Sequence, residues 1–89
     1  MTINVIVTSE PIMKRNQNGI PYVTFNIVEK STENNPNAYI VTVYNKASLK
    51  LVYLYLHKGD NVSLEGKLKS SQNFIVNNIG ADFLQKVYS

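Results

Sequence analysis

Alternating apolar and polar positions recur along much of this chain and predict a protein built mainly from β-strands. Between Tyr22 and Glu29, the apolar residues Val23, Phe25 and Ile27 occupy every second position, as expected for a strand with one buried face. Four further segments are predicted strands: Asn4–Thr8, Tyr39–Tyr44, Val62–Lys69, and a last one made of Phe74–Val76 and Ile79–Phe83 with a bend at Gly80. The polar segments that separate the strands favour turns: Lys14–Gly19, Ser31–Asn37 and Ser70–Asn73.

One segment in the middle of the chain has helical spacing instead. Apolar residues recur there at i, i+3, i+4 and i+7, which predicts a helix over Ala47–His57 that ends before Lys58–Gly59–Asp60. We expect Tyr53 and Tyr55 to pack against the rest of the protein, and His57 to interact with the helix dipole. The apolar arc is wider than one stripe, so the helix either closes a barrel end or contacts a partner.

The order of these elements is strand, strand, strand, helix, strand, strand. It matches the five-stranded OB barrel, an all-β fold with one short helix between its third and fourth strands. A chain of 89 residues has room for one hydrophobic core, so we expect a single domain over residues 1–89. The number and order of the predicted strands and helix alone are also compatible with other small β-barrels.

Composition excludes several classes of protein. The chain has no cysteine, which excludes a disulfide scaffold and a thiolate site, and its single histidine argues against a histidine metal centre or a Ser-His-Asp triad. It has no signal-peptide pattern and no apolar stretch that could span a bilayer, so a cytoplasmic protein without a membrane partner is expected. The formal net charge of +3 is compatible with a polyanionic partner but does not require one.

Catalysis is not expected. The six carboxylates are scattered over different predicted elements, without the pairing that general acid–base chemistry uses. The sequence has no Gly-rich phosphate loop, no metal-ligand cluster and no nucleophile elbow. Consequently no cofactor and no metal ion are expected.

A succession of motifs resembles the bacterial single-stranded DNA-binding proteins (the SSB family). The motifs are Gly19-x-Pro21-x-x-x-Phe25-x-Ile27, then Val41–Lys46, then Tyr55–Leu68, and finally Ala81–Asp82 followed by apolar residues. Their common order, from Asn4 to about Val87, carries the resemblance. It implies an OB fold that binds single-stranded DNA in replication or recombination and assembles as a homo-oligomer, a dimer or tetramer. It also implies other replication or recombination proteins as partners.

The chain also departs from the pattern of that family. The segment Lys69–Phe74 is a minimal turn where family members carry a longer basic and aromatic hairpin, and Ala38 stands where an early third-strand aromatic is expected. The chain has no tryptophan, and its last residues lack the acidic tail with which the family recruits partners. A compact SSB of the phage or plasmid type is the leading interpretation, and the compact, tailless PriB-type primosomal proteins are the alternative.

Aromatic residues that leave the core are the first candidates for a binding site, because bases of a single strand stack on them. Strand parity places Tyr22 and Tyr44 with Thr24 and Thr42, opposite the apolar residues of their strands. In an OB barrel this outward face binds nucleic acid, and the resemblance implies that Tyr44 is a stacking residue. Surface tyrosines are also common on sheets without such a role.

The other aromatic residues are less decisive. Phe74 either replaces the missing aromatic of the hairpin or packs in the core, and the pattern leaves both open. Tyr39 has the parity of the buried valines of its strand, so we expect it to point inward or to lie at the barrel end.

Basic residues near the same face are the candidate phosphate contacts. They are Lys14, Arg15, Lys30, Lys46, Lys67 and Lys69. A single surface lysine is more often just a solvated charge, so the argument depends on several of these residues flanking one aromatic face.

The sequence thus predicts an OB-fold protein that binds single-stranded DNA without strong sequence preference. The alternative is an OB-fold adaptor that binds another protein and has weak affinity for DNA, because fold alone does not determine function.

Overall fold

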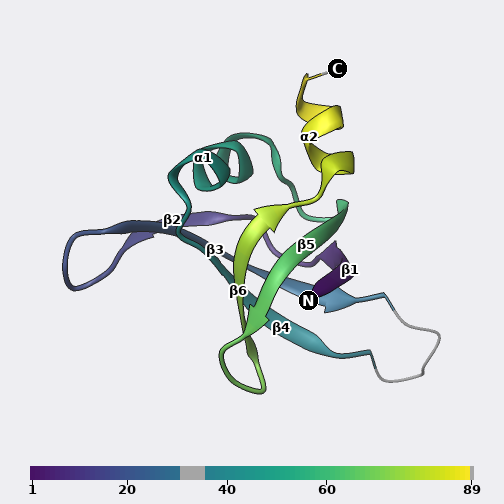
Figure 1. Ribbon diagram of the computed structural model, residues 1–89, viewed down its shortest axis with the longest axis horizontal. Coiled ribbons are helices and arrows are strands. Elements are labelled where there is room, and N and C mark those ends of the chain that lie inside the picture. Colours follow the sequence, from purple (N-terminus) through teal and green to yellow (C-terminus); the bar gives the residue numbers. More distant parts are fainter. Residues whose placement is uncertain (31–35, 89) are drawn as a thin grey trace.

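The computed structural model describes residues 1–30 and 36–88 as six strands and two helices (Figure 1). The elements are β1 (Thr2–Val7), β2 (Ile12–Arg15), β3 (Pro21–Glu29), β4 (Ala38–Val43), α1 (Lys46–Tyr55), β5 (Asn61–Leu68), β6 (Asn73–Ile79) and α2 (Ala81–Tyr88). Most of the predicted polar loop over 31–37 lies outside the described residues. No helix among the described residues is long and apolar enough to cross a membrane.

Five of the strands close into a barrel. The hydrogen-bonded order is β1-β5-β6-β4-β3-β2, and an additional pairing of β1 with β3 completes the ring. β4 and β6 run parallel, whereas the other neighbouring pairs are antiparallel. With α1 between β4 and β5, this is the predicted OB barrel with one added strand, β2.

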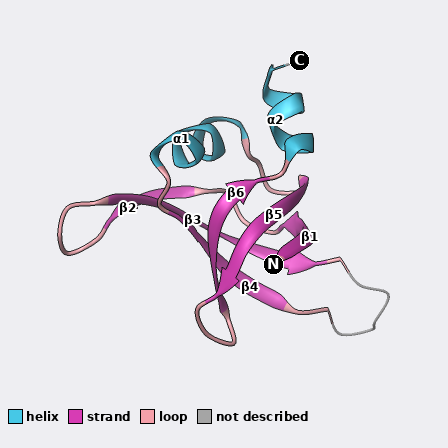
Figure 2. Cartoon of the chain, viewed as in Figure 1, coloured by secondary structure: helices cyan, strands magenta, loops and turns pink. Residues whose placement is uncertain are grey.

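The period of two predicted from the sequence decides which side chains fill the barrel. Val23, Phe25 and Ile27 of β3 are buried, and so is every second residue of β4, beginning with Tyr39. The inward position expected for Tyr39 is therefore confirmed. Both helices lie on the same side of the molecule, and the turn between β5 and β6 points away from them (Figure 2).

Strand β2 takes up Lys14 and Arg15, the first two residues of the predicted turn at Lys14–Gly19. Ile12–Arg15 pairs with the start of β3, and the tight turn that follows has Gly19 at φ 77°. The Asn16 side chain accepts hydrogen bonds from the backbone N–H groups of Asn18 and Ile20, both at 2.9 Å. Charged residues suit this strand because it lies at the edge of the sheet.

Helix α1 begins and ends with identifiable caps. Asn45 Oδ1 accepts hydrogen bonds from the backbone N–H groups of Ala47 and Ser48, at 3.0 and 3.3 Å. Leu49, Val52 and the C-cap residue Leu56 are buried against the barrel. The predicted packing of Tyr53 and Tyr55 is wrong: the two side chains are 48% and 47% exposed, because the buried arc of the helix is narrow.

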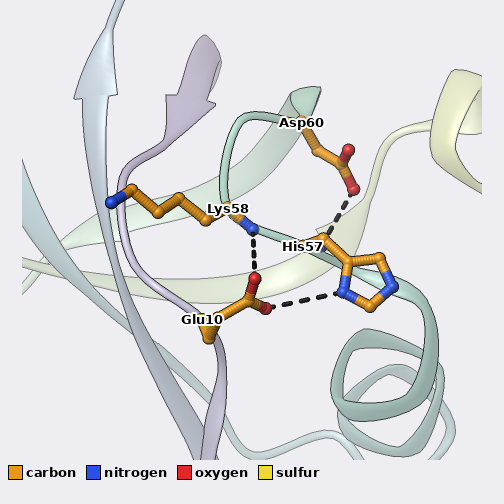
Figure 3. A network of polar contacts seen from close by, with 4 residues as sticks. All are labelled: Glu10, His57, Lys58 and Asp60. Carbon is orange, nitrogen blue, oxygen red and sulfur yellow. Dashed lines mark hydrogen bonds and ion pairs between the residues drawn. The ribbon is translucent and has the colours of Figure 1, made fainter.

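His57 lies beyond the end of α1, and the structure shows it in contact with Glu10 instead of in the predicted interaction with the helix dipole. Its Nδ1 is 3.5 Å from Oε2 of Glu10, and Glu10 Oε1 accepts a hydrogen bond from the backbone N–H of Lys58 (Figure 3). The Asp60 side chain accepts from the backbone N–H of His57 at 2.9 Å. These contacts join the bend after β1 to the loop between α1 and β5.

Helix α2 stands where the sequence pattern predicted the end of the last strand. β6 ends at Ile79, and the chain becomes helical from Ala81 instead of bending at Gly80 and continuing as a strand to Phe83. The physical reason is the spacing of the apolar residues Ile79, Phe83 and Val87, which recur every four positions. Phe83 is buried in the core, and Val87 packs against it.

Candidate nucleic-acid interface

The residues of β3 and β4 that point away from the core form one continuous surface, here called the outer face: Tyr22, Thr24 and Asn26 from β3, Ile40 and Thr42 from β4, and Tyr44 directly after it. The strand register brings them into rows, with Thr24 opposite Thr42 and Asn26 opposite Ile40. Residues directly opposite each other in a sheet point to the same side. The parity predicted for Tyr22, Thr24, Thr42 and Tyr44 is therefore confirmed, although their contact with DNA stays a prediction.

The two tyrosines of the outer face contact each other. The ring centroids of Tyr22 and Tyr44 are 5.3 Å apart, and the ring planes are tilted by 43°. Tyr22 is half-buried, whereas Tyr44, between the end of β4 and the N-cap of α1, is 42% exposed. The pair thus presents aromatic surface to solvent.

A depression of about 340 Å³ adjoins this pair. We call it the Tyr44 hollow; it is lined by Thr42, Tyr44, Lys69, Ser70, Asn73 and Ile75. It therefore combines an aromatic ring, hydroxyl and amide groups, and one ammonium group. No carboxylate lines it among the described residues.

Several predicted cations flank the same face. Lys14 on β2 lies directly opposite Tyr22, and Lys67 on β5 lies opposite Ile75, which lines the Tyr44 hollow. Lys46, in the first turn of α1, is exposed two residues after Tyr44. The structure therefore groups Lys14, Lys46, Lys67 and Lys69 around the tyrosine pair.

The remaining two predicted cations, Arg15 and Lys30, do not flank the tyrosine pair in the same way. Arg15 Nη1 donates a hydrogen bond to the carbonyl of Gly19 at 2.8 Å, so the guanidinium is held at the β2–β3 turn. Lys30 follows the far end of β3, about 26 Å along the strand from Tyr22, and its backbone N–H donates to the carbonyl of Asn4. The structure does not bring Lys30 near the tyrosines.

Phe74 is not available to a base. Its side chain has 0% exposure and lies 6.5 Å, centroid to centroid, from the ring of Tyr39 inside the barrel. Position 74 has inward parity on β6, and it pairs with Val41 of β4. Of the two alternatives left open by the sequence, core packing is the one observed, so Phe74 is removed from the candidate site.

A second depression on the outer face involves residues that the sequence analysis did not single out. We call it the Asn26 hollow; it has a volume of about 360 Å³ and is lined by Thr8, Asn26, Ala38, Ile40 and Gln72, among others. Strand parity could have identified two of these residues, because Asn26 and Ile40 have the same parity as Tyr22 and Tyr44. Gln72 comes from the turn after β5, so no parity rule could place it.

The described carboxylates and histidine form no metal site. Among the residues that the structure describes, no group of three His, Asp or Glu side chains could hold a metal ion. Glu10 contacts His57, and Glu29 accepts a hydrogen bond from the Asn37 side chain at 3.4 Å. Neither Glu10 nor Glu29 lines either hollow.

Solved structures of single-stranded DNA-binding proteins have a similar fold. A mitochondrial one from S. cerevisiae matches with a TM-score of 0.79 at 22% identity, over 90% of this chain and 89% of that chain. A small one from Streptomyces coelicolor gives 0.72 at 22% identity, over 90% and 88% of the two chains. The Plasmodium falciparum SSB in complex with single-stranded DNA gives 0.67 at 22% identity, over 90% and 89%.

Of the two sequence comparisons, one finds no match and the other agrees with this likeness of fold. No curated protein matches the chain. The model of the single-strand binding protein family, in contrast, matches residues 1–85, which is nearly the whole sequence. The chain therefore belongs to the single-strand binding protein family.

Proposed function

We propose that this protein binds single-stranded DNA on the outer face, without strong sequence preference and without catalysis, in replication or recombination. The observation that carries the proposal is the exposed Tyr22–Tyr44 pair beside a hollow that contains Lys69. Membership of the single-strand binding protein family supports it. So does the fold shared with an SSB whose structure contains single-stranded DNA.

In the proposed mechanism, bases stack on Tyr44 and Tyr22 while cations contact the phosphates between them. Every base offers a flat π-face, so this mode of binding tolerates any sequence. Lys14, Lys46, Lys67 and Lys69 are the proposed phosphate contacts, with Arg15 at the β2–β3 turn as a further one. Thr24 and Thr42, which lie between the tyrosines and the rest of the outer face, would contact the strand through their hydroxyl groups.

The length of DNA bound by one protomer should be short. β5 ends at Leu68 and β6 begins at Asn73, so only four residues connect them. A hairpin arm of the kind found in the family, which would extend the contact surface, is therefore missing at this place. Assembly into a dimer or tetramer and a cytoplasmic location are further parts of the proposal.

Fluorescence anisotropy with labelled dT oligomers of graded length tests the proposal directly. We expect binding that saturates at a short, fixed length and weakens as salt is added. Tyr44→Ala should reduce affinity by about 1–3 kcal/mol, the usual contribution of one base–aromatic stack. Tyr44→Phe should retain most of the affinity because it keeps the ring.

Tyr53→Ala is a matched control, since Tyr53 is equally exposed but lies on α1, outside both hollows. It should leave the affinity for dT unchanged. Equal losses for Tyr44→Ala and Tyr53→Ala, or no binding at low salt, would contradict the proposed interface.

A second candidate function is that of a PriB-like adaptor that binds another protein. The exposed side chains of Tyr53, Leu54 and Tyr55 on α1 favour it, because three large neighbouring groups remain accessible to solvent. An adaptor of this kind would bind dT weakly and would be insensitive to Tyr44→Ala. The same titration therefore separates the two functions.

A further inference from the structure

The outer face carries two hollows of similar size and different chemistry. The Tyr44 hollow contains an aromatic ring and an ammonium group, whereas none of the residues lining the Asn26 hollow is charged. Ile40 lines one hollow and Tyr44 the other, and the two residues are four positions apart, about 13 Å of extended chain. A few nucleotides of a single strand span such a distance.

The turn between β5 and β6 separates the two hollows. Ser70 of this turn lines the Tyr44 hollow, and Gln72, two residues later, lines the Asn26 hollow. The backbone N–H of Ile40 donates a hydrogen bond to the carbonyl of Gln72 at 2.7 Å, which holds the turn against β4. A strand that crosses the outer face therefore passes this turn.

The polar groups of the Asn26 hollow are free to bind a ligand. The backbone of Asn26 is fully engaged: its N–H donates to Ser9 Oγ, and its carbonyl accepts from the N–H of Thr8, both at 2.8 Å. The side-chain amides of Asn26 and Gln72, in contrast, make no hydrogen bond within the described residues. Each amide offers two donors and an acceptor.

An apolar surface lies between these amides. Ile40 is 44% exposed and opposite Asn26 in the β3–β4 register, and its neighbour on β6 is Asn73. The hollow thus combines an apolar face with amides at its margin. A nucleobase has the complementary shape and chemistry, a flat apolar face with donors and acceptors along its edge. A phosphate does not fit this description, since no cation lines the hollow.

We propose that the Asn26 hollow binds one nucleobase of the single strand by its edge, through the amides of Asn26 and Gln72, with Ile40 against the face of the base. This proposal rests on the proposed function. It adds a second mode of contact: stacking and charge on one side of the β5–β6 turn, neutral hydrogen bonding on the other. Neither the stacking nor the neutral hydrogen bonds release counterions, so only the cation contacts beside the tyrosines should depend on salt.

An abasic scan tests the proposal. A dT oligomer of the length that saturates one protomer is prepared with a single base removed at each position in turn, and each version is titrated by anisotropy. With the unaltered protein, removal of the base in the Asn26 hollow should weaken binding roughly threefold to tenfold, as expected for one or two neutral hydrogen bonds.

The double variant Asn26→Ala/Gln72→Ala should abolish this penalty while the penalties at the Tyr44-dependent positions remain. Its salt dependence should equal that of the unaltered protein, because no phosphate contact is lost. Gln72→Ala alone, a change in a turn, provides the same test on a less altered fold. Asn78→Ala is the control: Asn78 is an exposed amide of β6 that lines neither hollow.

Two outcomes would overturn the proposal, and they are distinguishable. If the unaltered protein binds dT through Tyr44 but the amide variants keep every abasic penalty, the Asn26 hollow is empty and the proposed function stands. If the unaltered protein does not bind dT at all, both proposals fail together.

Discussion

Contact between Tyr22 and Tyr44 in the unbound protein bears on how tightly a base can be held. Each ring restricts the other, so less side-chain freedom is lost when a base stacks on the pair. Aromatic pairs of this kind contribute about 0.5–1.5 kcal/mol beyond the burial of their surface. We infer that Tyr22 supports the position of Tyr44 as well as offering its own ring.

For Phe74 we predict an effect on stability and not on DNA affinity, because its ring fills the core. Phe74→Leu is a large-to-small change in the core and should lower the free energy of unfolding by about 1–2 kcal/mol. It should leave the affinity for dT within about twofold. Urea unfolding and anisotropy on the same samples measure both quantities. A loss of affinity without a loss of stability would contradict this prediction and would indicate that Phe74 belongs to the binding site.

The distribution of side chains shows what parity can and cannot predict. Parity along single strands correctly placed Tyr22, Thr24, Thr42 and Tyr44 on one surface. It could not predict the 5.3 Å between the two rings, since that distance depends on the register of β3 against β4. Nor could it select the Asn26 hollow, because Gln72 comes from a turn.

At the scale of elements, α1 depends on its N-cap. Asn45→Ala removes the acceptor of two backbone N–H groups and should lower the free energy of unfolding by about 1 kcal/mol. Asn45→Asp keeps a side-chain acceptor and should be nearly neutral. Urea unfolding of both variants is the measurement, and equal losses would show that the cap contributes little.

Strand β5 depends on a glycine where it is irregular. The β5–β6 register shifts between Glu65 and Gly66, and a Cβ on Gly66 would collide with the backbone carbonyl of Ile75. Gly66→Ala should therefore cost at least about 1–3 kcal/mol, the range for overpacked sites. Thermal unfolding measures it, with Gly19→Asn as the control in an open turn where Asn tolerates the positive φ. A fully stable Gly66→Ala protein would contradict this close approach.

Elements with a clear period were predicted well, and short or mixed ones were not. The alternation of β3, β4 and β5 and the helical spacing of α1 appear directly in the sequence. β2 was missed because Lys14 and Arg15, next to Asn-Gly, have the composition of a turn. α2 was missed because Ile79 and Phe83 fit the end of a strand as well as a helix face, and only the further position of Val87 distinguishes the two.

For the whole molecule, the grouping of cations predicts how binding responds to salt. Lys67→Ala and Lys69→Ala should each reduce the slope of log affinity against log salt by about 0.7, the value for one phosphate contact on a single strand. Lys58→Ala is the control, because Lys58 lies in the loop between α1 and β5 and lines neither hollow. Anisotropy titrations at several salt concentrations give the slopes. Equal slopes for all three variants would contradict a localised phosphate path.

Closure of the barrel has a consequence for how the chain folds. β1, at the start of the sequence, pairs with β5 some sixty residues later, and β4 finds its parallel neighbour β6 only after α1 and β5. Such distant pairings make folding slow compared with that of a helical bundle, on the order of milliseconds to seconds. During synthesis on the ribosome, one edge of β1 and one edge of β4 therefore stay unpaired until β5 and β6 have emerged. The interval in which this small barrel is most open to aggregation is set by its topology, not by its final stability.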